Sequence, residues 1–107
     1  MLCRVEGKNV NYKEVPLDYM VGGMKRYLED GVHPCGFLYG LLTNDLSNTW
    51  LVADDNNRKH IGDWLLFLKY ECPWDSHGSV SKVTQWMLDG GYTGRYNQGK
   101  SVDEVIR

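Results

Sequence analysis

Apolar side chains recur at helical spacing through most of this sequence, and this periodicity constrains the fold more than any other feature. The pattern is clearest between Pro16 and Gly31, where apolar residues three or four positions apart fall on one side of a helix. That stripe consists of Leu17, Met20, Val21, Met24, Tyr27 and Leu28. Proline suits the first turn of a helix, and glycine often follows the last one. The spacing therefore predicts a helix that begins at Pro16 and ends before Gly31.

Four more helices follow from the same pattern. The residues that begin them are His33 with Pro34, then Asp45, then Asp54 or Asp55, and finally Ser79. Aspartate and serine are favoured N-caps because their side-chain oxygens accept hydrogen bonds from free backbone N–H groups. The fourth helix, roughly 56–71, is apolar on most of its sides, which predicts burial by its neighbours or by another subunit. A homo-oligomer is therefore expected.

The sequence as a whole predicts an all-α fold of about five short helices. Its 107 residues fit one domain. We expect residues 1–15 to form a short extended arm, residues 16–90 the helical core, and residues 91–107 an irregular tail.

The net charge, the apolar runs and the cysteines limit the possible partners and the cellular compartment of this chain. The net charge of -2 gives no overall positive field for holding nucleic acid. No apolar run approaches the roughly 18 residues of a membrane span, and no signal-peptide pattern opens the chain. Cys3, Cys35 and Cys72 are an odd, widely spaced set, which favours a reducing cytosol over a disulfide framework.

The chain lacks the local motifs of catalytic and cofactor sites. It has no glycine-rich phosphate loop, no nucleophile elbow and no zinc-ligand spacing. The polar stretch 44–57 carries several carboxylates, but helix caps require the same residue types at these interruptions. We therefore expect no enzyme activity, no catalytic residue, no metal and no cofactor.

Aromatic residues outside the helical stripes form the first candidate site. The chain has four Trp, seven Tyr and two Phe, and most of those on stripes should be core. Trp74, Tyr92 and Tyr96 fall in loop or tail segments, where periodicity does not demand burial. With Arg95 they have the composition of interface hot spots. These four residues are predicted to bind a partner; an irregular tail without a binding role is the alternative.

Two glycines in the first helix form the second candidate site. Gly22 and Gly23 fall mid-helix, where glycine is unfavourable. They could allow another helix to approach closely, or leave bare backbone for a ligand. With Lys25 and Arg26 on the outer face, they are a candidate approach for a phosphate or another ligand.

A helix-turn-helix is a further alternative. Residues 78–86 could form a recognition helix presenting Ser81, Lys82, Thr84 and Gln85. Residues 58–107 contain seven basic and six acidic residues, and DNA-binding domains concentrate more positive charge than that. Nucleic acid is therefore the weaker choice of partner.

A spaced set of motifs resembles small uncharacterised proteins of bacteriophages and prophages. The motifs are a Gly-x-x-Pro-x-Gly-Phe-Leu box at 31–38, Asn-Asp-Leu at 44–46 and Ala-Asp at 53–54, within a resemblance over about residues 16–88. His33 and Cys35 depart from the usual pattern. The resemblance implies an accessory protein of a mobile element, acting in the cytoplasm of the bacterial host.

That origin leads to a functional hypothesis. Small phage accessory proteins often inhibit host processes, as anti-CRISPR proteins do. We expect a non-enzymatic protein that binds and inhibits a bacterial host protein in a defence complex. The alternative is an oligomeric sponge that sequesters a nucleotide second messenger.

Overall fold

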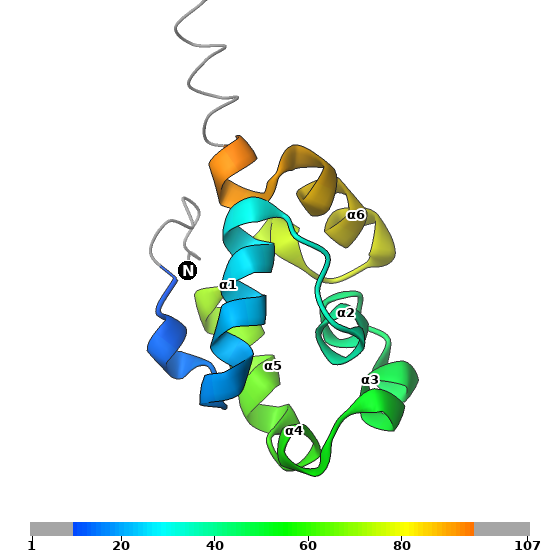
Figure 1. Ribbon diagram of the computed structural model, residues 1–107. Coiled ribbons are helices and arrows are strands. Elements are labelled where there is room, and N and C mark those ends of the chain that lie inside the picture. Colours follow the sequence, from blue (N-terminus) through cyan, green and yellow to red (C-terminus); the bar gives the residue numbers. More distant parts are fainter. Residues whose placement is uncertain (1–9, 96–107) are drawn as a thin grey trace, which may run out of the picture.

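The computed structural model describes residues 10–95, and these form an all-α fold without strands (Figure 1). The α-helices are α1 (Val21–Asp30), α2 (Gly36–Leu42), α3 (Leu46–Val52), α4 (Asp55–Lys59), α5 (Ile61–Glu71) and α6 (Val80–Asp89). Three short 3-10 helices accompany them: η1 (Tyr12–Glu14), η2 (Asp18–Met20) and η3 (Trp74–Ser76). Residues 91–95 are also helical.

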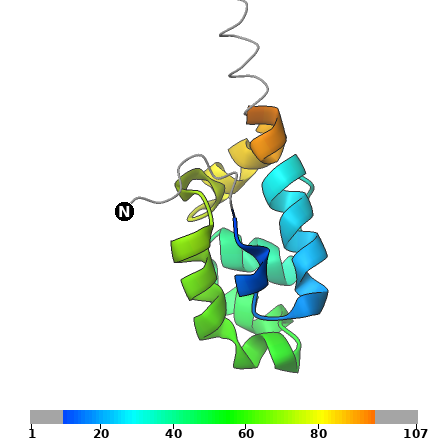
Figure 2. The same ribbon diagram turned by 90° about the vertical axis from the view of Figure 1, so that its left-hand side faces the viewer.

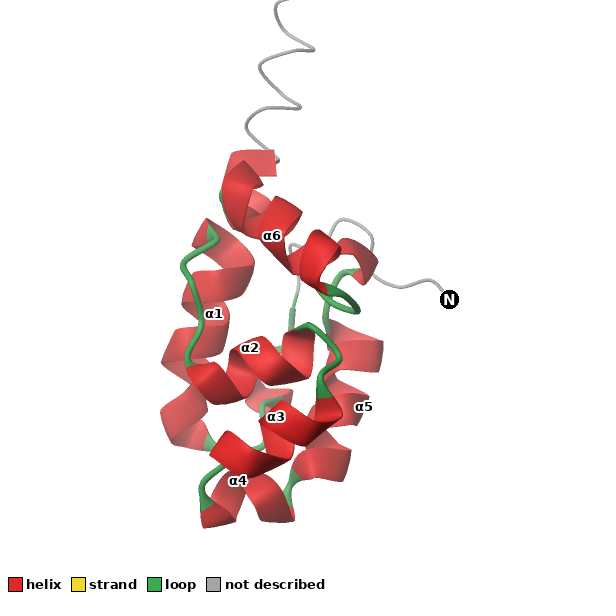
Figure 3. Ribbon diagram, turned by 90° about the vertical axis from the view of Figure 1, so that its right-hand side faces the viewer, coloured by secondary structure: helices red, strands yellow, loops and turns green. Residues whose placement is uncertain are grey.

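The helices enclose a core between α1 and α5. Figure 2 shows these two helices flanking the N-terminal segment, with α2 and α3 behind it, and Figure 3 shows α2 between α1 and α5 from the other side. Trp64 is fully buried at the centre, edge-on to Phe37 and Phe67 at centroid distances of 5.7 and 6.0 Å. The indole N–H of Trp86 donates to the Tyr27 carbonyl oxygen at 3.1 Å, which ties α6 to the end of α1.

The predicted helix caps are confirmed. Asp45, Asp54 and Ser79 each accept a hydrogen bond from the backbone N–H three residues ahead. Gly31 and Gly90 end α1 and α6 in the left-handed conformation, with φ of 72° and 83°. These ends are fixed by chemistry within one turn of the chain, which is why the sequence locates them.

The first two predicted helices begin later than expected. Residues 18–20 are 3-10 helix and α1 begins only at Val21, so Gly22 and Gly23 lie in its first turn and not mid-helix. The second helix begins at Gly36, after an extended Cys35.

The predicted fourth helix is wrong in one respect, since it is broken at His60 into α4 and α5. Its own neighbours bury its apolar surface only in part, and burial of the remainder by another subunit stays a prediction. Leu65, Leu66 and Tyr70 are each more than half exposed, because α5 has core neighbours only on the side of Trp64.

The predicted arm and tail are also different where the structure describes them. Val10 and Val15 are buried, and a 3-10 turn lies between them. Residues 91–95 are helical and not irregular. The remainder of both segments lies outside the described residues.

Candidate binding surfaces

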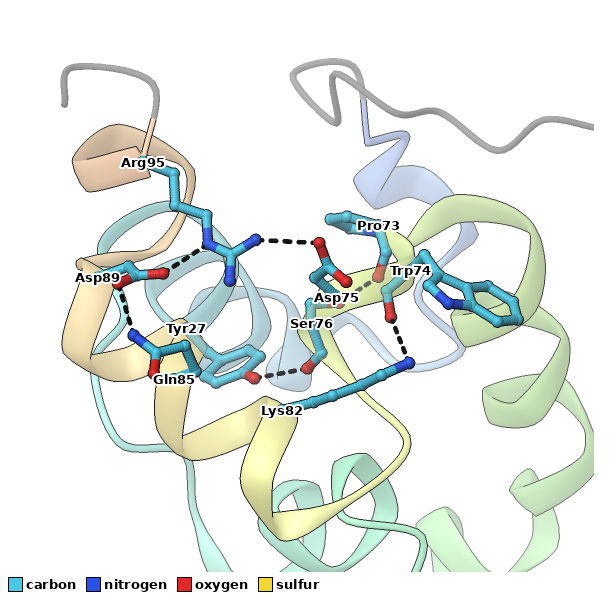
Figure 4. Close-up of polar contacts among 9 residues, drawn as sticks. All are labelled: Tyr27, Pro73, Trp74, Asp75, Ser76, Lys82, Gln85, Asp89 and Arg95. Carbon is cyan, nitrogen blue, oxygen red and sulfur yellow. Dashed lines mark hydrogen bonds and ion pairs between the residues drawn. The ribbon is translucent and has the colours of Figure 1, made fainter. Parts of the chain in front are cut away.

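Arg95, predicted to contact a partner, makes three contacts with its own chain. Its Nε donates to Asp89 Oδ2 at 2.9 Å and its Nη1 to Asp75 Oδ2 at 3.2 Å (Figure 4). The guanidinium also lies 4.6 Å from the ring centroid of Trp86. These contacts join residues 91–95 to α6 and η3, so Arg95 has a structural role in this fold.

The other members of the predicted aromatic set are not all exposed either. Tyr92 is partly buried against the core, edge-on to Trp86 at 5.2 Å. Trp74 is 68% exposed, with Lys82 Nζ 4.8 Å from its ring centroid. Tyr96 lies outside the described residues. Of the members placed by the structure, Trp74 alone offers a largely exposed aromatic ring.

The predicted recognition helix is α6. Ser81, Thr84 and Gln85 are exposed, but the Gln85 amide donates to Asp89 at 2.8 Å. Lys82 lies over Trp74, and its ammonium is 3.5 Å from the Trp74 carbonyl oxygen. The Lys82 ammonium thus already contacts groups of its own chain. This does not favour a role for α6 in binding the phosphates of nucleic acid.

The two glycines of α1 serve different purposes. A Cβ on Gly23 would lie 3.6 Å from Leu38 Cδ1, so this glycine allows α1 to approach α2 closely. A Cβ on Gly22 would lie 3.2 Å from Arg26 Nη1, because the Arg26 side chain folds back over the start of the helix. Lys25 points elsewhere, its ammonium 5.8 Å from the ring centroid of Tyr12.

An apolar surface on α3 was not predicted from the sequence. Thr49 is the one buried residue of this helix, while Leu46 and Leu51 are 68% and 74% exposed and Trp50 is half exposed. The helix therefore directs a polar side chain inward and large apolar ones outward. Figure 1 shows α3 at the edge of the molecule, on the far side of α2 from α1.

Close packing against α2 sets this orientation. A Cβ on Gly40 would lie only 2.8 Å from Thr49 Oγ1 and 3.1 Å from the Thr49 backbone nitrogen. The Thr49 hydroxyl is satisfied locally by donating to the Asp45 carbonyl oxygen at 2.6 Å. A small hydroxyl residue therefore fits against the glycine, and the leucines of α3 are left on the other side.

The exposed apolar side chains of α3 form a continuous surface with apolar side chains of α5. Leu46, Trp50, Leu51 and Ile61 line a hollow of about 540 Å³, and Leu46 and Ile61 line an adjoining one with Leu65. We call these five residues the α3–α5 surface. The one signal that could have pointed to this surface is the large number of apolar residues between 46 and 66, more than a small helical core can cover.

The rim of this surface carries charge. Asp45 lies at one end as the cap of α3, with Oδ1 accepting from the Asn48 N–H at 3.1 Å. At the other end Arg58 lies 5.5 Å from the Trp50 ring centroid and donates from Nε and Nη2 to the Trp50 carbonyl oxygen. Arg58 also pairs with Asp55 at 3.3 Å. Trp50 is thereby held in one orientation.

The titratable side chains of Tyr27 and Cys72 are buried inside the fold. The Tyr27 hydroxyl donates to the Ser76 carbonyl oxygen at 2.5 Å, and burial raises the pKa of Tyr27. Burial also raises the pKa of the Cys72 thiol well above its usual value, which keeps it protonated and weakly nucleophilic. Both groups act as packed structural elements.

Residues 10–95 contain no cluster of three or more side chains placed to ligate a metal ion. No helix in that range is long and apolar enough to cross a membrane. Comparison with known proteins finds no matching family model, curated protein or solved structure.

Proposed function

We propose that this chain is a non-enzymatic accessory protein of a phage or prophage that binds and inhibits a bacterial protein, a component of host defence, in the bacterial cytoplasm. The orientation of α3 is the observation that carries the proposal. Fully burying a leucine contributes about 1.5–3 kcal/mol, and α3 leaves Leu46 and Leu51 mostly exposed. A contiguous exposed apolar surface with a polar rim is typical of a protein interaction site.

The contact surface is the α3–α5 surface. Trp50 supplies its aromatic anchor, and Arg58 holds the indole in place before binding. A tryptophan of this kind, surrounded by leucines, has the composition of an interface hot spot. Because its orientation is fixed in advance, little side-chain entropy is lost on association.

Charge around this surface indicates what the partner should present. Residues 31–57 contain three aspartates and no lysine or arginine, and Arg58 pairs with only one of these carboxylates. The Asp45 side chain stays exposed beside Leu46. The partner should therefore offer an apolar segment flanked by lysine or arginine. Such complementary charge raises the rate of association and favours the correct partner over others.

Two matched leucine variants test the proposal. Leu51 on α3 and Leu88 on α6 are 74% and 75% exposed, so Leu51→Lys and Leu88→Lys make the same change on two faces. Each variant is immobilised and used to capture proteins from a bacterial lysate, and the captured protein is then purified and its affinity measured by calorimetry. We expect Leu51→Lys to weaken binding by at least about 2 kcal/mol, the threshold of a hot spot, and Leu88→Lys to bind as the parent does.

Inhibition is measured in the same pair. Each variant is expressed in bacteria that carry the defence system to which the captured protein belongs, and phage plating is counted. The parent and Leu88→Lys should restore plating and Leu51→Lys should not. Equal behaviour of the two variants in binding and plating would refute the proposed surface.

A further inference from the structure

A second, separate cavity lies between the start of α1 and the start of α2. It has a volume of about 240 Å³, and its lining includes Tyr19, Gly23, Arg26, His33, Cys35 and Leu38. None of these residues belongs to the α3–α5 surface. We call it the Arg26 groove.

Arg26 gives one end of the groove its charge. Its guanidinium lies beside Gly22 and Gly23, 3.2 Å and 4.0 Å from where their Cβ atoms would be. Within residues 10–95 it makes no hydrogen bond or ion pair, in contrast to Arg58 and Arg95. A planar guanidinium without a carboxylate partner is suited to bind a phosphate through two parallel N–H···O bonds.

Two aromatic rings that also line the groove are held by contacts with their neighbours. The Tyr19 hydroxyl donates to Asp54 Oδ2 at 2.6 Å, which restrains a ring that is otherwise more than half exposed. His33 stacks on Tyr39 with a centroid distance of 5.1 Å and an interplanar angle of 13°. Its Nδ1 lies 2.8 Å from the Pro34 carbonyl oxygen, which can only accept, so Nδ1 carries the proton and Nε2 is the other polar atom of the ring.

The lining also includes apolar side chains, among them Leu38 and Met20. A ligand that matches these parts has a flat ring for the aromatic side and a phosphate for Arg26. The volume of about 240 Å³ lies below the usual range of about 300–1,000 Å³ for ligand pockets. A groove of this size covers a ligand of one nucleotide unit only in part, and it is too small to enclose two.

We propose that the Arg26 groove binds a single nucleotide unit, with its phosphate on Arg26 and its base against Tyr19 and His33. The unit is a free mononucleotide or one end of a longer nucleotide signal. Because the groove is separate from the α3–α5 surface, this inference stands or falls independently of the proposed function.

Cys35 provides a reporter at the site. It is exposed, whereas Cys72 is buried, so in a Cys3→Ser background a thiol reagent should label Cys35 selectively. We expect AMP, GMP, CMP or UMP to slow this labelling. Adenosine should be at least about tenfold less effective, because it lacks the phosphate. Cyclic di-AMP tested beside AMP separates a free mononucleotide from the end of a longer signal.

Two neighbouring basic residues supply the matched variants. Arg26→Gln removes the cation of the groove, and we expect it to reduce protection by the nucleoside monophosphates at least about tenfold. Lys25→Gln removes an equal charge whose ammonium faces Tyr12, and it should leave protection unchanged. Leu51→Lys should also leave it unchanged. Thermal unfolding of each variant shows that the fold is retained.

Three results would overturn the inference. One is that none of the four nucleoside monophosphates protects Cys35 at millimolar concentration. Another is equal protection in the Arg26→Gln variant, since the phosphate would then not be on Arg26. The third is protection by inorganic phosphate as strong as that by AMP, which would mean that the rings contribute nothing.

Discussion

Gly91 lies where the helical residues 91–95 meet the end of α1, and replacing it by alanine is the most demanding test of this packing. Its φ is +67°, a left-handed conformation that a residue with a Cβ adopts only at a cost. A Cβ there would lie 2.7 Å from three backbone atoms, in Leu28, Glu29 and Gly31. Backbone atoms inside a helix end cannot move aside as a side chain can.

The expected loss of stability has two parts. The left-handed conformation costs about 1–2 kcal/mol for a residue other than glycine. Forcing an extra methyl group into a closely packed contact typically adds about 1–3 kcal/mol. We therefore expect Gly91→Ala to lower the free energy of unfolding by about 3 kcal/mol, which in a domain of this size lowers Tm by about 12–24 °C.

Gly90→Ala is the matched control. Gly90 is also left-handed, at φ +83°, but the nearest atom to its Cβ position is Gly94 Cα at 3.3 Å. It should lose mainly the conformational part, about 1–2 kcal/mol, because a contact at 3.3 Å needs only a small shift of Gly94. Urea unfolding followed by circular dichroism gives both free energies. If Gly91→Ala were no less stable than Gly90→Ala, the close approach to α1 would be refuted.

Two further predictions concern polar side chains inside the fold, the buried Asn57 and the half-buried His77. The indole N–H of Trp64 donates to Asn57 Oδ1 at 2.8 Å in the core, so Asn57→Ala should cost about 1–3 kcal/mol by leaving that donor unpaired, as measured by urea unfolding. Burial lowers the pKa of His77 from 6.5, and the charge of Lys82 lowers it further. The neutral imidazole therefore stabilises the fold above pH 6.5, and this stabilisation is lost as pH falls below that value. Thermal unfolding should show a smaller decline from pH 7 to pH 5 in His77→Gln than in the parent chain; an equal decline would contradict it.

How far the sequence predicts this fold depends on the range of the interaction involved. The caps at Asp45, Asp54 and Ser79 were predictable because each acceptor and donor lie three residues apart. The break at His60 was not, since residues 54–60 carry no apolar side chain whose spacing could show where one helix ends and the next begins. Near this break the Asn57 side chain lies in the core and accepts a hydrogen bond from the Trp64 indole N–H. This contact joins two helices, and no sequence motif predicts it.

The residues of the candidate binding site were harder to predict, because the same side chains and contacts occur in the interior of a domain and in an interface with a partner. Tyr92 and Arg95 have the composition of a hot spot, yet they pack on Trp86 within the chain. Cation–π contacts and ion pairs stabilise a domain as readily as an interface. Exposure therefore decides their role, and exposure depends on how residues 91–95 return to α1, which composition does not encode.

The orientation of α3 follows from the contact between Gly40 and Thr49. Because of this orientation, the side chains proposed to bind the partner are not the ones that stabilise the fold. With Gly40 beneath it, only a small residue such as Thr49 fits against α2, so the leucines of α3 contribute little to the stability of the isolated chain. Substitutions at exposed positions usually change stability by no more than about 0.5 kcal/mol. Leu51→Lys should therefore unfold at the temperature of the parent chain. Loss of binding in a variant of unchanged stability is then a property of the α3–α5 surface, because the fold that presents it is intact.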